Sequence, residues 1–118
     1  MLFRSEYASK TFGQREYLYF FRTVIVIRKA IKKKTICRFY TDEKSFTFVP
    51  VSIEMSPIYN YNYVVGIDRD GNPQAIRLCE IVKASITENK LKATETMCEL
   101  ITDLLEKIYE EEYNECSV

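Results

Sequence analysis

Apolar residues recur along this chain with two different periods. Between Tyr17 and Ile31 they are spaced three and four residues apart, which is typical of a helix with one buried stripe. The spacing predicts a helix over about 14–33, opened by a capping box at Thr11 and Gln14 and preceded by an arm over 1–13. The β-branched run TVIVI leaves a strand as the competing interpretation, but the length and the lysine-rich end favour the helix.

After Lys34 the period changes to two, which predicts strands. Five of them are expected, over 35–41, 45–55, 61–67, 74–79 and 82–87. Pro50 indicates an edge position or a kink in the second strand, because proline cannot donate to a ladder. A bend near Glu80 should separate the last two strands, since unbroken alternation would place its carboxylate on an apolar face. Five short antiparallel strands after a helix predict a small β-barrel.

The helical period returns near the C-terminus. Met97, Ile101, Leu104 and Ile108 predict an amphipathic helix over about 92–112, so the fold class is α+β with a helix at each end of the barrel. Glutamates at the end of this helix oppose its dipole, and the last turn should fray unless a basic partner covers it. The predicted organisation is an arm over 1–13, a helix plus barrel over 14–91, and a helix over 92–118 that belongs to the same domain or mediates dimerisation.

Composition narrows the function classes. The chain has 118 residues, 47% of them apolar, which is enough for one folded domain, and no apolar run reaches the roughly 20 residues of a membrane span. We therefore expect a cytoplasmic protein without membrane contact. Histidine is absent and the four cysteines form no C-x-x-C pair, so neither a metal nor another cofactor is expected. Without a histidine base or a glycine-rich phosphate loop, we expect a protein that is not an enzyme.

Charge is segregated along the chain, although the net charge is zero. Residues 1–44 carry 11 Lys and Arg against 4 Asp and Glu, whereas residues 45–118 carry 6 against 13. The basic excess peaks over 28–38 and includes Lys33 and Lys34. Such a run attracts phosphate backbones through counterion release, but the oppositely charged ends of a small protein also pair with each other or with a second copy. The sequence leaves both explanations open.

Arg77 is the candidate binding residue that the pattern isolates. Ile76 and Leu78 share one face of the fourth strand, so Arg77 points to the other, where either solvent or a ligand meets its guanidinium. Tyr40, Tyr61 and Tyr63 interleave with Arg38 and Arg77 on neighbouring strands. Flat rings beside planar cations suit nucleotides or single-stranded nucleic acid, with tyrosines lining a core as the alternative.

The order of these parts resembles a WYL domain over more than half of the chain. The resemblance rests on the stretches AIKKKTICRFY (30–40), Pro50, NYVVG (62–66) and IRLCEI (76–81). Within them Tyr63, Gly66, Arg77 and Leu78 agree with the family pattern. Asn62 replaces the family's tryptophan, Cys79 its aspartate and Glu80 its second arginine, so the basic pocket of the family loses a positive charge and a stacking plane.

The resemblance implies an Sm-like or SH3-like barrel that binds a nucleotide or single-stranded nucleic acid. It implies a regulatory role in bacterial transcription or beside a CRISPR effector, with a DNA-binding domain or an effector as partner. Tyr63 and Arg77 carry over as ligand contacts, Arg38 and Tyr40 as their neighbours, and Lys33 and Lys34 widen the positive field. The alternative is an interaction module with an inert barrel that forms a homodimer through its terminal helices.

Overall fold

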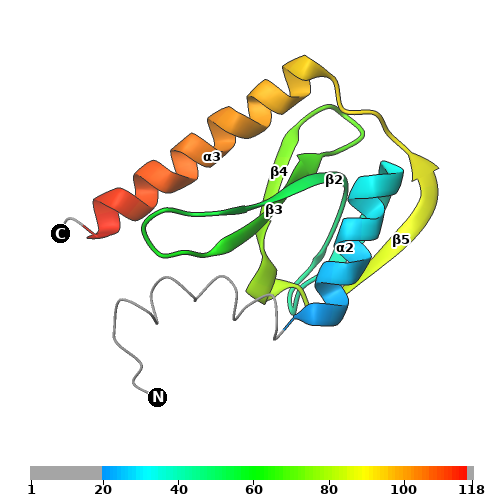
Figure 1. The fold of residues 1–118 in the computed structure, drawn as a ribbon, viewed down its shortest axis with the longest axis horizontal. Coiled ribbons are helices and arrows are strands. Elements are labelled where there is room, and N and C mark those ends of the chain that lie inside the picture. Colours follow the sequence, from blue (N-terminus) through cyan, green and yellow to red (C-terminus); the bar gives the residue numbers. More distant parts are fainter. Residues whose placement is uncertain (1–19, 117–118) are drawn as a thin grey trace.

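The computed structural model describes residues 20–116. This part of the chain forms a helix, five strands interrupted by a short 3-10 turn, and a second helix, so the α+β class is confirmed (Figure 1). In chain order the elements are α2 (Phe21–Lys33), β1 (Thr35–Tyr40), β2 (Ser45–Met55), β3 (Asn62–Ile67), β4 (Pro73–Arg77), η1 (Leu78–Glu80), β5 (Lys83–Lys90) and α3 (Glu95–Cys116). The predicted arm, the capping box and the start of the first predicted helix lie outside the described residues.

The five strands form one antiparallel sheet in the order β4-β3-β2-β1-β5. The sheet is open, because β4 and β5 stand at its two ends and do not pair with each other, so the closed barrel predicted from the sequence is not observed. The predicted bend near Glu80 is confirmed as η1, which breaks the alternation between β4 and β5. A chain with five short strands can close or stay open, and strand periodicity alone does not distinguish the two outcomes.

β2 is the long central strand that joins the two halves of the sheet. Residues 45–48 pair with β1, and residues 49–55 pair with β3. The register shifts between Pro50 and Ser52, so the proline lies at a bulge, where the missing donor breaks no regular ladder. The predicted kink at Pro50 is therefore confirmed, whereas the alternative of an edge strand is wrong.

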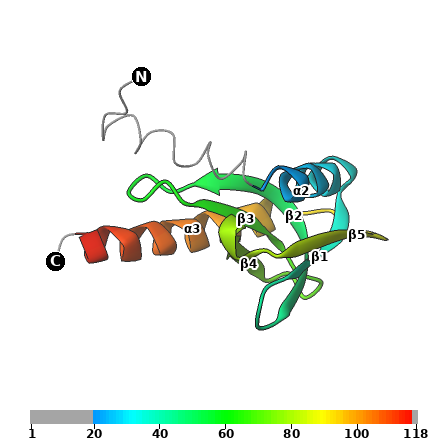
Figure 2. The ribbon, with the colours of Figure 1, turned by 90° about the horizontal axis from the view of Figure 1, so that it is seen from below.

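The sheet carries a hydrophobic core on each face. On one face α2 packs Val24, Ile27 and Ala30 against side chains that include Cys37, Phe39, Phe48, Val64 and Ile76. On the other face α3 packs Ile101, Leu105 and Ile108 against side chains that include Val49, Tyr63, Val65, Ile67 and Ala75. Figures 1 and 2 accordingly show the two helices on different sides of the sheet. Adjacent strand residues alternate between the cores, as period-two alternation requires.

Local chemistry explains several boundaries. Lys34 ends α2 in the left-handed conformation, with φ of 56°, and its amide donates to the carbonyl groups of Ala30 and Ile31. In the β3–β4 turn Gly71 supplies a φ of +83°, while Asp68 Oδ1 accepts the amides of Asp70 and Asn72 at 2.9 and 3.0 Å. The Asp-Gly hairpin predicted from the sequence is therefore confirmed.

The helix α3 begins and ends later than predicted, at Glu95 and Cys116 instead of about 92 and 112. The expected fraying of the last turn is not observed within the described residues. A buried contact of Glu112 with the sheet, described below, compensates for the unfavourable position of the glutamates at this end of the helix dipole. The run TVIVI lies within α2, so the helical interpretation of this segment is confirmed.

Candidate functional site

Arg77 and Tyr63 lie directly opposite each other on β4 and β3. Arg77 is on the face opposite Ile76, as alternation predicts, and is half-buried. Its Cζ lies 3.6 Å from the centroid of the Tyr61 ring, so the guanidinium stacks on an aromatic face. Two of the three tyrosines that the sequence singled out therefore surround the arginine.

Glu112 of α3 completes this group. The hydroxyl of Tyr63 donates to Glu112 Oε2 at 3.0 Å, and the glutamate is only 5% exposed. Burial, the hydrogen bond to Glu112 and the charge of Glu112 together raise the pKa of Tyr63 well above its ordinary value of 10.0, and the charge of Arg77 partly offsets this rise. We call Tyr61, Tyr63, Arg77 and Glu112 the Arg77 cluster.

The Arg77 cluster contains a donor and an acceptor that other described residues leave unused. Arg77 Nε and Glu112 Oε1 are both buried, and neither has a hydrogen-bond partner within the described part of the chain. The sequence analysis offered solvent or a ligand as the neighbour of the guanidinium, and it did not predict that Glu112 of the C-terminal helix lies close to this group. The signal was present, because the stripe Ile101, Leu105 and Ile108 is spaced four and three residues apart, and a further step of four reaches Glu112.

Arg38 and Tyr40 do not join the Arg77 cluster. Arg38 is exposed and lines a shallow hollow with Thr47 and the β3–β4 turn (68–70), next to Ile67 at the end of β3. Tyr63 lies four residues earlier on β3, roughly 13 Å away along an extended strand. Tyr40 is half-buried at the end of β1, with Lys83 Nζ 5.9 Å from the centroid of its ring.

The positions at which the chain departs from the WYL pattern fall in two different places. Asn62 is buried at 2% exposure, and it opens β3. Cys79 and Glu80 are exposed in η1 and line a hollow with residues 41–44 of the β1–β2 turn. Asn62 lies in the chain between Tyr61 and Tyr63 of the Arg77 cluster, whereas Cys79 and Glu80 line a different hollow.

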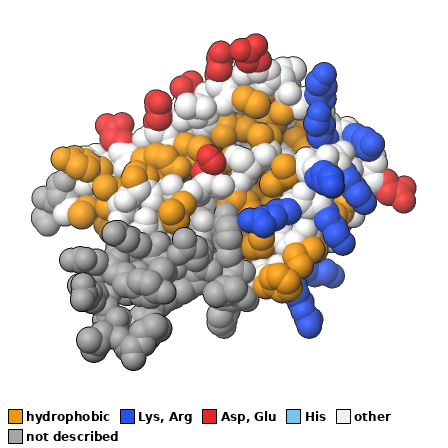
Figure 3. Space-filling view, viewed as in Figure 1, with side chains coloured by type: hydrophobic (Ala, Val, Ile, Leu, Met, Phe, Trp, Pro, Cys, Tyr) orange, Lys and Arg blue, Asp and Glu red, His pale blue; other side chains and the backbone are white. Residues whose placement is uncertain are grey.

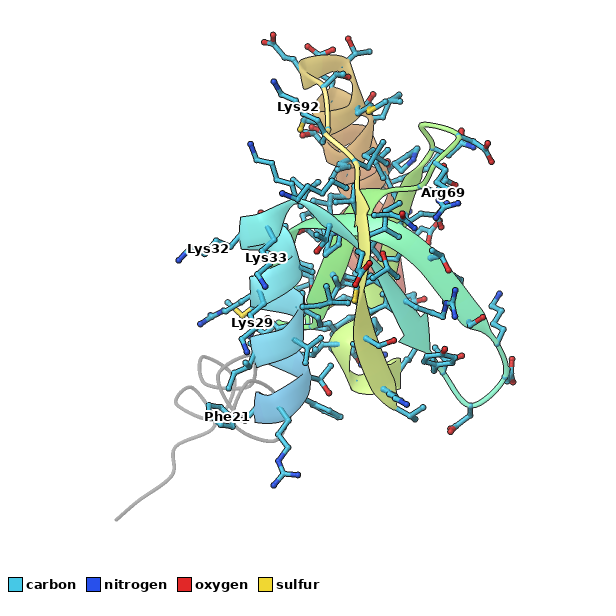
Figure 4. All side chains as sticks on the ribbon, turned by 90° about the vertical axis from the view of Figure 1, so that its right-hand side faces the viewer. Phe21, Lys29, Lys32, Lys33, Arg69 and Lys92 are labelled. Atoms are coloured by element: carbon cyan, nitrogen blue, oxygen red, sulfur yellow. The ribbon has the colours of Figure 1, made fainter. Side chains whose placement is uncertain are left out.

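Lys33 and Lys34 belong to a basic face at the C-terminal end of α2. We define this basic face as Lys29, Lys32, Lys33 and Lys34, all of which are exposed. None of the four forms an ion pair with another described residue. Figure 4 shows that Lys29, Lys32 and Lys33 project from the helix away from the sheet, and Figure 3 shows Lys and Arg side chains gathered on this side of the molecule.

The acidic residues gather elsewhere. The exposed side of α3 carries Glu95, Glu99, Asp103, Glu106, Glu110, Glu111 and Glu115. In Figure 3 most acidic side chains follow the edge formed by α3, and one lies beside the basic side chains. Because α2 and α3 pack on opposite faces of the sheet, the basic face does not meet the acidic side of α3 within one molecule. Of the two explanations for charge segregation, pairing between these two helices of one chain is therefore not observed.

The described part of the chain is a small α+β domain built on an open antiparallel sheet, and the Arg77 cluster lies where α3 meets this sheet. Comparison of the sequence with known protein families and with curated proteins finds no match. The resemblance to WYL domains therefore remains a prediction. Neither described helix is both long enough and apolar enough to cross a bilayer. Across residues 20–116, no three His, Cys, Asp or Glu side chains are grouped so that they could hold a metal ion.

Proposed function

We propose that this chain is a regulatory module that binds a negatively charged ligand, either a nucleotide or single-stranded nucleic acid, through the basic face of α2. The observation that carries the proposal is a group of four exposed lysines, three in the last two turns of α2 and Lys34 at its C-cap, none of them paired with a described acidic residue. Lysines in this arrangement gain free energy by displacing the counterions condensed on a phosphate chain. The ligand then controls transcription or a CRISPR effector, the settings that the WYL resemblance implies.

In this proposal Tyr63 and Arg77 are secondary contacts. An anion that approached the guanidinium would meet the carboxylate of Glu112, which is hydrogen-bonded to the residue opposite Arg77. Two like charges held close together in a buried setting repel each other strongly. Within residues 20–116 no carboxylate forms an ion pair with the basic face of α2, which favours phosphate contacts there over contacts at Arg77.

The test is a salt titration of binding to labelled single-stranded RNA and DNA, followed by fluorescence anisotropy. Each phosphate neutralised on a single strand contributes about −0.7 to the slope of log K against log salt, so the triple variant Lys29→Gln, Lys32→Gln, Lys33→Gln should flatten the slope by about 2. The matched control removes the same charge elsewhere through Lys44→Gln, Lys83→Gln and Lys107→Gln, all at exposed positions. Equal slopes for the two triple variants would refute the assignment to α2.

A second function, self-association, is favoured by the separation of charge. The basic face of α2 and the acidic side of α3 cannot meet within one molecule, but they can meet between two copies. Mass measurement in low and high salt tests this candidate. Dimers at low salt that dissociate at high salt, with no oligonucleotide bound in either condition, would favour self-association over ligand binding.

A further inference from the structure

A hollow of about 290 Å³ lies between residues of the core under α2 and residues of the core under α3. Its walls are Ile31 from α2, the bent segment 49–51 of β2, and Leu91 and Ala93 from the β5–α3 connection. Ile31 packs with the core under α2, whereas Val49, Leu91 and Ala93 pack with the core under α3. Pairing along β2 passes from β1 to β3 after residue 48, and the residues 49–51 beside the register shift line the hollow.

The hollow combines an apolar interior with a positive rim. Lys34 and Lys92 are the charged residues among those that line it, and both are exposed. Their segments are held side by side, because the amide of Leu91 donates to the carbonyl oxygen of Lys34 at 3.1 Å. Figure 4 places Lys92 beyond the end of α2 that carries Lys32 and Lys33, so these lysines add to the positive field around the opening.

We propose that this hollow binds a small amphipathic carboxylate, with its aliphatic chain inside and its carboxylate between Lys34 and Lys92. Its volume lies near the lower end of the roughly 300–1,000 Å³ typical of ligand pockets, so a single short acyl chain fits better than a drug-sized molecule. The site shares Lys34 with the basic face of α2, but its interior is lined by other residues, and the proposal does not depend on phosphate binding.

The lining distinguishes a carboxylate with an aliphatic chain from a nucleotide. The side chains of the interior are aliphatic, apart from the thiol of Cys98. A nucleobase placed there would leave its ring nitrogens and carbonyl groups without hydrogen-bond partners, and such groups are costly to bury. An alkyl chain has no such groups, and its one charged end reaches the two lysines at the rim.

The first experiment is calorimetric titration of the full chain with butyrate, hexanoate and octanoate. Affinity should rise about fourfold for each methylene that enters the hollow. Octanol, which keeps the chain but lacks the charge, should bind about tenfold more weakly than octanoate if each lysine contributes about threefold. Octylammonium should not bind. Equal binding of octanoate and octylammonium, or no saturable binding of octanoate, would overturn the proposal.

Two variants locate the ligand within the structure. Ala93→Leu places a larger side chain in the hollow and should abolish octanoate binding, while Lys92→Gln should weaken it about threefold without touching the interior. Lys29→Gln is the matched control, because it removes one exposed charge of α2 outside the hollow. If Ala93→Leu unfolds the chain, the contrast between Lys92→Gln and Lys29→Gln decides the outcome, and equal affinities for these two would overturn the proposal.

The reactivity of Cys98 provides a second measurement of binding, which does not use the calorimetric signal. In a chain with Cys79→Ser and Cys116→Ser, the remaining thiols are Cys98, which lines the hollow, and Cys37, which is buried. Octanoate should slow the reaction of Cys98 with a thiol reagent in proportion to occupancy, and octylammonium should not. Unchanged labelling at saturating octanoate would place the ligand elsewhere. Protection that depends on protein concentration alone would indicate that a second copy fills the hollow, and would also overturn the proposal.

Discussion

Removal of a single hydroxyl group, by Tyr63→Phe, should weaken the attachment of α3 to the sheet. The wild-type hydroxyl donates to Glu112 Oε2 at 3.0 Å, and the other carboxylate oxygen has no hydrogen-bond partner among the described residues. In the variant, both oxygens of a glutamate that is 5% exposed would lack a protein donor within this part of the chain. A buried carboxylate that has lost its hydrogen-bond donor is among the costliest single defects in a fold.

The size of the destabilisation by Tyr63→Phe depends on the charge of the acceptor, the carboxylate of Glu112. A hydrogen bond to a charged group contributes roughly 1.5–3 kcal/mol, and loss of a buried partner adds a desolvation cost, so Tyr63→Phe should lower the free energy of unfolding by about 3 kcal/mol. For a domain of this size the midpoint of thermal unfolding should fall by roughly 10 °C. In a chain that carries Glu112→Met, the same hydroxyl has no carboxylate to satisfy, and Tyr63→Phe should cost less than about 0.5 kcal/mol.

The assay is a double-mutant cycle on Tyr63→Phe and Glu112→Met, measured by urea unfolding at neutral pH. We expect a coupling free energy of about 2–3 kcal/mol between the two positions. Hydrogen exchange of α3 amides should increase in Tyr63→Phe before that of α2 amides, because only α3 carries the partner. A cost below about 0.5 kcal/mol for Tyr63→Phe in the wild-type chain would show that the contact does not hold the helix.

Three further variants test other parts of the structure. Gly66→Ala should cost about 3 kcal/mol in urea unfolding, because the new Cβ would overlap the carbonyl oxygen of Val49 and lie 2.6 Å from a ring carbon of Phe48; a cost no larger than that of Gly71→Ala would contradict this. Burial raises the pKa of Cys37 from 9.0 to about 11, so the protonated thiol stabilises the fold below pH 9, and this contribution is lost as the pH rises from 9 to 11. In Cys37→Ala the free energy of unfolding should decline between pH 9 and 11 by up to about 2 kcal/mol less than in the wild-type chain. An equal decline in both chains would refute the raised pKa of Cys37. Arg77→Ala should weaken oligonucleotide binding less than the triple lysine variant of α2 does; an equal loss at low salt in a folded protein would move Arg77 to the centre of the site.

Periodicity was sufficient to predict most of the elements. The bounds of β2 agree with the prediction, and the end of α2 agrees as well, because both depend on local pattern and on the residues that break it. Closure of the sheet was predicted incorrectly, since it depends on whether β4 and β5 approach each other after η1, and no local pattern encodes that distance.

The candidate site was only partly predictable for the same reason. Alternation assigned Arg77 to the correct face, and strand pairing brought Tyr63 opposite it. Glu112 was missed because a glutamate in an acidic run is ordinarily solvated, and only the docking of α3 buries it. Arg38 was grouped with Arg77 because their strands were expected to be neighbours, whereas β2 and β3 lie between β1 and β4 in the sheet.

The shared strand β2 has a consequence for how this protein folds and for how it can be divided. Its first four residues pair with β1 and the remainder pairs with β3. The core under α2 joins Phe39 of β1 with Val64 of β3 and Ile76 of β4, so neither half keeps this core without the other. Fragments cut within 45–55 should therefore be unable to fold separately and should fold only when both are mixed. Amide protons near Pro50 should exchange with deuterium only through global opening of the molecule, so the domain behaves as a single cooperative unit.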